Sequence, residues 1–243
     1  MNKKLFVLLF LFTMLISGCS GVWSRNDMLK KNSELLTKIE DLEAMKDDLN
    51  NSKKIIEFYN ELSNNNMNSL VLVESKNRIT QAKKYSNGVI VANVGVYFYI
   101  LVDYYSLKQD YMNLTIMDSY VNSYNGHEYL INEETGLALL YFTISDSSSK
   151  VNVTSLGEYS EIFAYLDSME QKQLNKVMVL DNIKSSTVVY NNTTYDSYII
   201  ENMNINNGGL LINIDNKLMG IYSSKLNVFV NSSLISEIVD FTI

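Results

Sequence analysis

From residue 69 onward the chain consists of short apolar and aromatic runs separated by clusters of Asn, Asp, Ser and Gly. Runs of this kind, bounded by turn-forming residues, are typical of β-strands. We expect nine strands, at residues 69–74, 88–93, 97–102, 114–117, 138–144, 176–180, 210–214, 218–222 and 228–230. No helical pattern separates them, which favours antiparallel barrels or sandwiches over alternating β/α units. The sequence therefore predicts an all-β fold that closes on one short helix at 232–239.

Composition excludes several classes of function. The 243 residues include 20 Lys and Arg against 27 Asp and Glu, a net charge of −7, and 47% of them are hydrophobic, as in a globular protein. An acidic chain offers no cationic face for phosphates, so we expect no nucleic-acid partner. The single Cys and the single His are too few for a metal site built on either residue type. We expect neither a metal nor a cofactor.

The N-terminal segment has the organisation of an export signal. Lys3 and Lys4 precede a twelve-residue apolar run at 5–16, which is too short to span a bilayer in the mature protein. The letters I-S-G-C that end at Cys19 resemble the bacterial lipobox, in which the cysteine is lipidated and becomes the new N-terminus. The alternative is an ordinary secreted protein with an unmodified cysteine. We predict a signal peptide at 1–18 and a lipoprotein held on the outer face of the bacterial cytoplasmic membrane.

A charged segment with a seven-residue repeat follows a short tether at 19–25. Four apolar residues recur every seven positions: Leu35, Leu42, Leu49 and Ile56. Residues 26–62 therefore predict a long amphipathic helix, followed by a polar linker at 63–68. The second heptad position falls on Lys38 and Ser52, so a coiled-coil seam would be imperfect. Two roles stay open: a solvated stalk, or a helix that associates with itself or with a partner.

Three blocks of the β-rich part share their order and spacing with one known family. They are SNGVI at 86–90 followed by YFYILVDYYSL at 97–107, ETGLALL at 134–140, and INNGGLLINIDNKLMGI at 205–221. They resemble the G-S-G-V-I strand and the following strand that ends in T-N-x-H-V, the block T-D-L-A-L-L, and the block P-G-N-S-G-G-P-L-x-N-x-x-G-K-x-I-G-I of trypsin-like serine peptidases of the bacterial high-temperature-requirement type. The resemblance covers roughly residues 69–243, with 160–196 poorly matched.

The resemblance implies two packed antiparallel β-barrels of trypsin-like (chymotrypsin) type, preceded by the N-terminal helix. The first barrel would occupy about residues 69–149 and the second about 150–243. The peptide-binding module that often follows the peptidase domain in this family has no counterpart in the sequence, which ends at Ile243.

Matched position by position, the resemblance replaces all three catalytic residues. The histidine position falls on Tyr105, the aspartate on Gly136 and the nucleophilic serine on Asn207. A tyrosine hydroxyl is a poor base at neutral pH, glycine has no side chain, and an amide is no substitute for an activated hydroxyl. Ile205 stands at the glycine of the oxyanion loop, where a β-branched residue does not readily adopt glycine conformations. We therefore expect no peptidase activity.

Other polar residues do not suggest a replacement site. His127 is expected to be a surface or hydrogen-bonded residue. Asp103 is expected to be solvated; the alternative is a place near the cleft between the two barrels that the resemblance implies. The adjacent Glu133 and Glu134 project to different sides and are interpreted as turn residues, and the pair at 215–216 predicts a hairpin turn.

The resemblance also indicates a binding mode that needs no triad. In the family, the strand after the nucleophile block pairs its backbone with an extended peptide. Here that strand corresponds to Gly220, Ile221, Tyr222, Ser223 and Ser224. We predict a membrane-tethered binding or scaffold protein with a protein or peptide partner, able to form homo-oligomers through residues 26–62. Two alternatives stay open: a structural coiled-coil lipoprotein capped by the β domain, and an enzyme with a rearranged site.

Overall fold

The computed structural model describes residues 3–65, 68–120, 122–145, 151–169, 173–180, 183–201 and 203–240. The chain forms two compact units, the helical unit Met1–Lys54 and the β-rich unit Ile55–Ile243. The side chain of Cys19, the predicted lipidation site, lies outside the described part of the structure.

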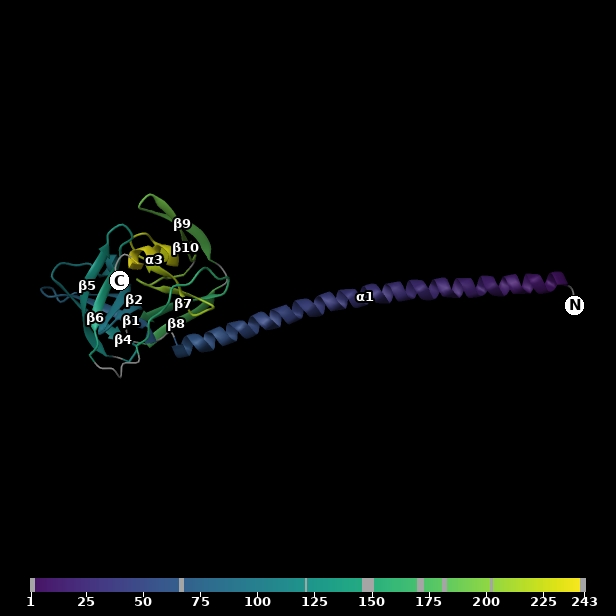
Figure 1. The fold of residues 1–243 in the computed structure, drawn as a ribbon, viewed down its shortest axis with the longest axis horizontal. Helices are drawn as coiled ribbons and strands as arrows, with labels where there is room; N and C mark the ends of the chain where they lie inside the picture. Colours follow the sequence, from purple (N-terminus) through teal and green to yellow (C-terminus); the bar gives the residue numbers. More distant parts are fainter. Residues whose placement is uncertain are drawn as a thin grey trace. The chain divides into compact units, whose positions relative to one another are not determined.

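One helix, α1, spans Lys3–Asn65 (Figure 1). The helix predicted at 26–62 is confirmed, but α1 also includes the residues of the expected tether at 19–25 and the first three of the expected linker at 63–68. The physical reason is the absence of a stop signal: the chain has no Pro, and α1 contains Gly only at 18 and 21.

The first part of the β-rich unit is a closed antiparallel barrel. Its strands are β1 (Leu70–Asn77), β2 (Lys83–Val94), β3 (Tyr97–Asp103), β4 (Met112–Asp118), β5 (Ser123–Asn132) and β6 (Leu137–Thr143), and the short helix α2 (Tyr104–Leu107) follows β3. The strands pair in the order β1-β2-β3-β6-β5-β4, and β4 also pairs with β1, which closes the ring. The run β4-β1-β2-β3 is a Greek key.

The second part is a seven-stranded antiparallel sheet followed by a helix. Its elements are β7 (Phe163–Met169), β8 (Gln173–Leu180), β9 (Lys184–Tyr190), β10 (Thr193–Ile199), β11 (Leu210–Asn213), β12 (Leu218–Ser223), β13 (Val228–Asn231) and α3 (Ser232–Asp240). The strand order is β8-β7-β11-β12-β13-β10-β9. The two strands at the ends of this order, β8 and β9, are consecutive in the chain, with only residues 181–183 between them.

The nine predicted strands and the closing helix are confirmed. Four further strands, β5, β7, β9 and β10, were not expected. Three of them are rich in polar and exposed residues: the side chains of β5 are exposed or half-buried throughout, and β9 and β10 carry mainly Ser, Thr and Tyr. Pairing with neighbouring strands holds them in place, which a local apolar pattern does not reveal.

Neighbouring residues along the central strands pack into different hydrophobic clusters, because successive side chains of a strand point to opposite faces. Ile90, Ile100 and Leu140 belong to a cluster of residues from the barrel and the segments next to it. Their neighbours Val89, Leu101 and Leu139 instead join residues of β7, β11, β12, β13 and α3. Strands buried on both faces thus connect the barrel and the second sheet through one shared core.

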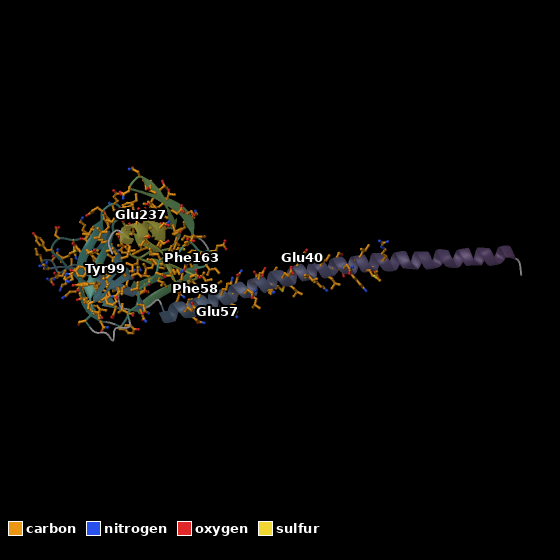
Figure 2. All side chains as sticks on the ribbon, viewed as in Figure 1. Glu40, Glu57, Phe58, Tyr99, Phe163 and Glu237 are labelled. Carbon is orange, nitrogen blue, oxygen red and sulfur yellow. The ribbon has the colours of Figure 1, made fainter. Side chains whose placement is uncertain are left out.

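The last turns of α1 belong to the same core. Phe58 and Leu62 are 2% and 1% exposed and pack in the shared cluster, and Figure 2 labels Phe58 near the end of the helix. The Asn216 amide, in the turn between β11 and β12, donates a 2.7 Å hydrogen bond to the carboxylate of Glu61. This turn includes the hairpin predicted at 215–216, which is confirmed, and Asn216 has the positive φ of +60° that such turns favour.

Candidate functional site

Two of the three positions matched to catalytic residues lie next to each other. Tyr105, in α2, donates its backbone N–H to the C=O of Gly136 at 2.9 Å, although 31 residues separate them in sequence. Gly136 ends the turn that precedes β6, and its N–H donates to the C=O of Asn132 at 2.9 Å. Glu133 and Glu134 are exposed in this turn, as predicted.

The space beside Gly136 is already occupied. A Cβ atom at this position would lie 2.7 Å from the Cβ of Lys225 and 3.1 Å from the Cβ of Tyr105. The backbone has φ +73°, a conformation that residues with side chains rarely adopt. The position therefore has neither the room nor the backbone conformation for a carboxylate-bearing residue.

The hairpin between β12 and β13 covers this region. The Ser223 hydroxyl donates to the C=O of Thr135 at 2.5 Å, and the Lys225 ammonium donates to the C=O of Glu133. These contacts hold the hairpin against the turn before β6, so residues of the second sheet contact the barrel beside Tyr105 and Gly136.

Asn207 lies against β2. Its C=O accepts hydrogen bonds from the backbone N–H of Asn87 at 2.9 Å and from the Asn87 amide at 3.0 Å, and its own amide is 3.4 Å from the C=O of Tyr85. In the described part of the chain no hydrogen bond joins Asn207 to Tyr105 or Gly136. The structure thus brings two of the three positions into contact, and the third is held by other partners.

A buried acid that sequence reasoning missed holds the loop around Asn207. Asp167, on β7 and 2% exposed, accepts a 3.0 Å hydrogen bond from the Asn87 amide and a second one from the Asn206 amide. The Tyr165 hydroxyl accepts the Asn206 N–H at 3.1 Å, and burial raises the pKa of this hydroxyl. Ile205 packs against the cluster that contains Tyr165. Because 160–196 matches no family block, no signal pointed to Asp167.

The turn at Asn207 also requires a glycine. The N–H of Gly209 donates to the C=O of Asn206 at 3.0 Å, which closes a four-residue turn with Gly208 at φ +68°. A Cβ atom on Gly208 would lie only 2.3 Å from the C=O oxygen of Asn87. The loop therefore lies so close to the backbone of β2 that a side chain at position 208 would overlap with it.

The expectation that Asp103 is solvated is wrong. This residue ends β3, is fully buried, and has its carboxylate without a well-oriented donor among the described residues. Burial raises its pKa, and nearby groups of Ser224 and Ser106 oppose that rise only in part. Burial, and to a lesser extent the charge of Asp103, raises the pKa of Tyr222. Asp103 is buried because the β12–β13 hairpin, more than 100 residues away in sequence, lies next to it.

His127 does not join these residues. It is exposed on β5, where its ring stacks on Tyr141 with centroids 5.0 Å apart, and it lines a surface hollow with Arg78 and Glu128. Its predicted surface position is confirmed. Within the residues that the structure describes, no group of three His, Cys, Asp or Glu side chains could hold a metal ion.

The strand expected to pair with a peptide is mostly occupied. Gly220 and Ile221 pair with β11 on one side and with β13 on the other. The N–H of Tyr222 donates to the C=O of Gly209 at 2.8 Å. Only Ser223 and Ser224 extend beyond this neighbour, and Ser223 is fully buried. The part of this strand that can pair with another chain is therefore short.

No protein-family model matches the chain, and no curated protein matches it in sequence. In the portion of the chain that the structure covers, no helix is both long enough and apolar enough to cross a bilayer.

Proposed function

We propose that this chain is a catalytically inactive relative of trypsin-like peptidases, a lipoprotein tethered through Cys19 to the outer face of the bacterial cytoplasmic membrane, where it acts as a binding or scaffold protein. Two structural features support it beside the sequence blocks: the strand order of the two sheets and the occupied space at Gly136.

Strand order supports a double-barrel ancestry. β8 and β9 stand at the two ends of the strand order in the second sheet. If they are counted as one bent strand, the sheet has six strand positions and its order closes into a ring. Numbered along the chain, these positions pair in the order 1-2-3-6-5-4, which is the order of the closed barrel. Two successive Greek-key rings with one strand order are what a pair of trypsin-like barrels requires.

The observation that carries the inactive state is the filled position at Gly136. A triad needs a carboxylate to orient the base, and here Lys225 and Tyr105 occupy the volume that its side chain would need. The neighbouring acid, Asp103, is buried beneath the β12–β13 hairpin and is not presented to solvent. Tyr105, two residues after Asp103, is 54% exposed. Such a surface suits binding rather than proton transfer.

Two assays on the full chain test the proposal. We expect no hydrolysis of unfolded casein; turnover that Asn207→Ala abolishes would contradict the inactive state, and turnover that Asn207→Ala leaves unchanged would indicate an unrecognised site or a contaminating peptidase. We expect Cys19→Ala to move the protein from the membrane fraction to the soluble fraction. An unchanged membrane fraction would contradict the tether.

Binding of extended peptides is tested at Ser224, which is only partly buried. We expect micromolar binding that is weakened at least tenfold by Ser224→Tyr and is unchanged by Asp215→Tyr, a matched change in the hairpin between β11 and β12. Equal binding by both variants would place recognition elsewhere on the protein.

A second candidate function is structural, with α1 as the working surface. The observation that favours it is the exposed apolar stripe of the helix, in which Leu42 and Leu49 are 64% and 70% exposed. Deletion of residues 26–54 separates the two candidates, because it removes the stripe and keeps Phe58 and Leu62 in the core of the β-rich unit. A partner that still binds the shortened chain is recognised by the β-rich unit.

A further inference from the structure

The apolar stripe of α1 extends over four heptads, from Met28 to Ile56, and its side chains are exposed. Its first heptad position, a, holds Met28, Leu35, Leu42, Leu49 and Ile56, and Met45 and Tyr59 stand at the second position, d. All of them are between 46% and 70% exposed. Exposed apolar side chains in this number on one face of a helix indicate an interaction surface.

The residues that flank the stripe carry opposite charges on its two sides. In the same heptad register, position g of successive heptads holds Glu34, Asp41 and Asp48. Position e holds Lys46 and Lys53 in two successive heptads. In a parallel coiled coil, a g residue faces the e residue of the following heptad on the other helix. This rule brings Asp41 opposite Lys46 and Asp48 opposite Lys53. In a symmetric dimer of two helices, each of these pairs forms twice.

The same charges select the orientation and the partner. An antiparallel pair would bring g next to g and e next to e, and so acids next to acids and lysines next to lysines. A second copy of this helix, parallel and in register, satisfies both pairings with no other protein. Position d also holds Lys31, Lys38 and Ser52. The two lysines favour two strands, because their stems can lie along the seam of a dimer while the ammonium groups reach water.

In the last turns of α1, the residues that dock on the β-rich unit differ from those of the stripe. Phe58, Glu61 and Leu62, which contact the unit, occupy heptad positions c, f and g. At about 100° per residue, Phe58 points about 200° away from Ile56. Ile56 and Tyr59 accordingly stay 60% and 46% exposed at the level where the helix meets the unit. At this level Phe58 and Glu61 lie on the side of α1 away from the seam, and Leu62, at position g, borders it.

We propose that α1 forms a parallel, in-register homodimer through Leu35, Leu42, Leu49 and Ile56, with Asp41–Lys46 and Asp48–Lys53 pairs across the seam. The pairing uses only the helix and holds whether or not the β-rich unit binds a peptide. Two chains anchored in one membrane also start in the parallel orientation, at a raised effective concentration.

Single cysteines test orientation and register in the full chain, kept in its membrane. We expect Leu42→Cys and Leu49→Cys each to form a disulfide-linked species of twice the mass of the single chain under mild oxidation. Asp47→Cys, at position f on the other side of the helix, serves as the matched control and should stay monomeric, as should the unmodified chain. Cross-linking that appears only when the two seam variants are mixed indicates an antiparallel pair and overturns the proposal, as does no cross-linking at all.

Charge reversal tests the flanking pairs. We expect Asp41→Lys with Asp48→Lys to weaken the dimer at least tenfold in detergent solution, measured by sedimentation equilibrium. Adding Lys46→Asp and Lys53→Asp to the same chain restores opposite charges across a parallel seam and should restore the dimer. A double variant as dimeric as the original chain, or a fourfold variant that stays monomeric, overturns the predicted register.

Discussion

At the scale of the single residue, the buried carboxyl group of Asp103 makes folding depend on pH. Its pKa is raised in the folded chain by burial, so the folded state prefers the neutral carboxyl. Its favourable contribution is fully present below the unfolded pKa and is lost as pH rises through the raised folded pKa. The free energy of unfolding should therefore fall as pH rises from about 4 into the raised range.

Asp103→Asn should remove this part of the pH dependence. We expect the variant to be more stable than the original chain at neutral pH, by on the order of 1 kcal/mol, and no more stable at pH 3. Urea titrations at several pH values measure the difference. Asp215→Asn, at an exposed hairpin position, is the control and should leave the profile unchanged. An Asp103→Asn profile parallel to that of the original chain would contradict the raised pKa.

Two glycines with nearly the same backbone conformation separate strain from close contact. Gly208 has φ +68° and its Cβ would meet the Asn87 C=O at 2.3 Å, whereas Gly95 has φ +64° with nothing within 4 Å. Gly95→Ala should cost about 1 kcal/mol, because only the backbone is strained. Gly208→Ala should cost about 3 kcal/mol or more, because Asn87 must also move. Denaturant midpoints measure both, and equal costs would show that the loop moves away freely.

Local sequence predicts some of the site residues and misses others for a physical reason. The positions that the resemblance assigns to a triad come from the sequence blocks alone, because the identity of a residue at a position is local information. The burial of Asp103 and the role of Asp167 depend on contacts with residues more than 30 positions away. The local sequence of a strand that ends in Asp is the same whether that Asp is covered by a distant hairpin or exposed to water.

At the scale of the element, the end of α1 is held by packing that its heptad pattern does not predict. Phe58 and Ile56 are two residues apart, yet Phe58 is 2% exposed and Ile56 is 60% exposed. We expect Phe58→Ala to lower the stability of the β-rich unit by about 3 kcal/mol through the cavity that it leaves. Ile56→Ala should change stability by no more than about 0.5 kcal/mol, as exposed positions do.

Thermal unfolding of the full chain, followed by near-ultraviolet circular dichroism of the tyrosines, measures the pair. Equal effects of the two variants would mean that the last turns of α1 do not dock on the β-rich unit.

The strands were predictable where burial made them apolar. β3, β6 and β12 are buried over most of their length and were recognised from their apolar runs. β9 and β10 pair with each other over seven residues and are largely exposed, so their polar sequences resemble loops. Local pattern thus misses β9 and β10, which are held mainly by backbone pairing. It also missed β7, although Phe163, Tyr165 and Leu166 of that strand are buried.

At the scale of the whole molecule, the strand order follows from contacts between distant segments. Apolar periodicity predicts an all-β chain, but it does not say that β4 returns to β1 or that β11 returns to β7. Only the resemblance of the sequence blocks to a family implied two rings. The shared core adds a property that neither route predicted, since residues of the barrel pack with those of the second sheet.

That shared core predicts a single unfolding transition for the β-rich unit. Val89, Leu101 and Leu139 of the barrel are fully buried in a cluster that the second sheet and α3 complete. Loss of the second sheet would expose these side chains to water, at about 25 cal/mol for each Å² of apolar surface. It would also leave the amide of Asn87 without the carboxylate of Asp167. The barrel therefore has no stable state of its own.

We expect far- and near-ultraviolet circular dichroism to follow one coincident urea transition in the full chain. Asp167→Ala should shift the whole transition to lower urea without splitting it, because Asn87 and Asn206 lose the same partner at the boundary of the two sheets. Two separated transitions would contradict the argument. They would show that the barrel and the second sheet are independent domains, in spite of the side chains that they bury together.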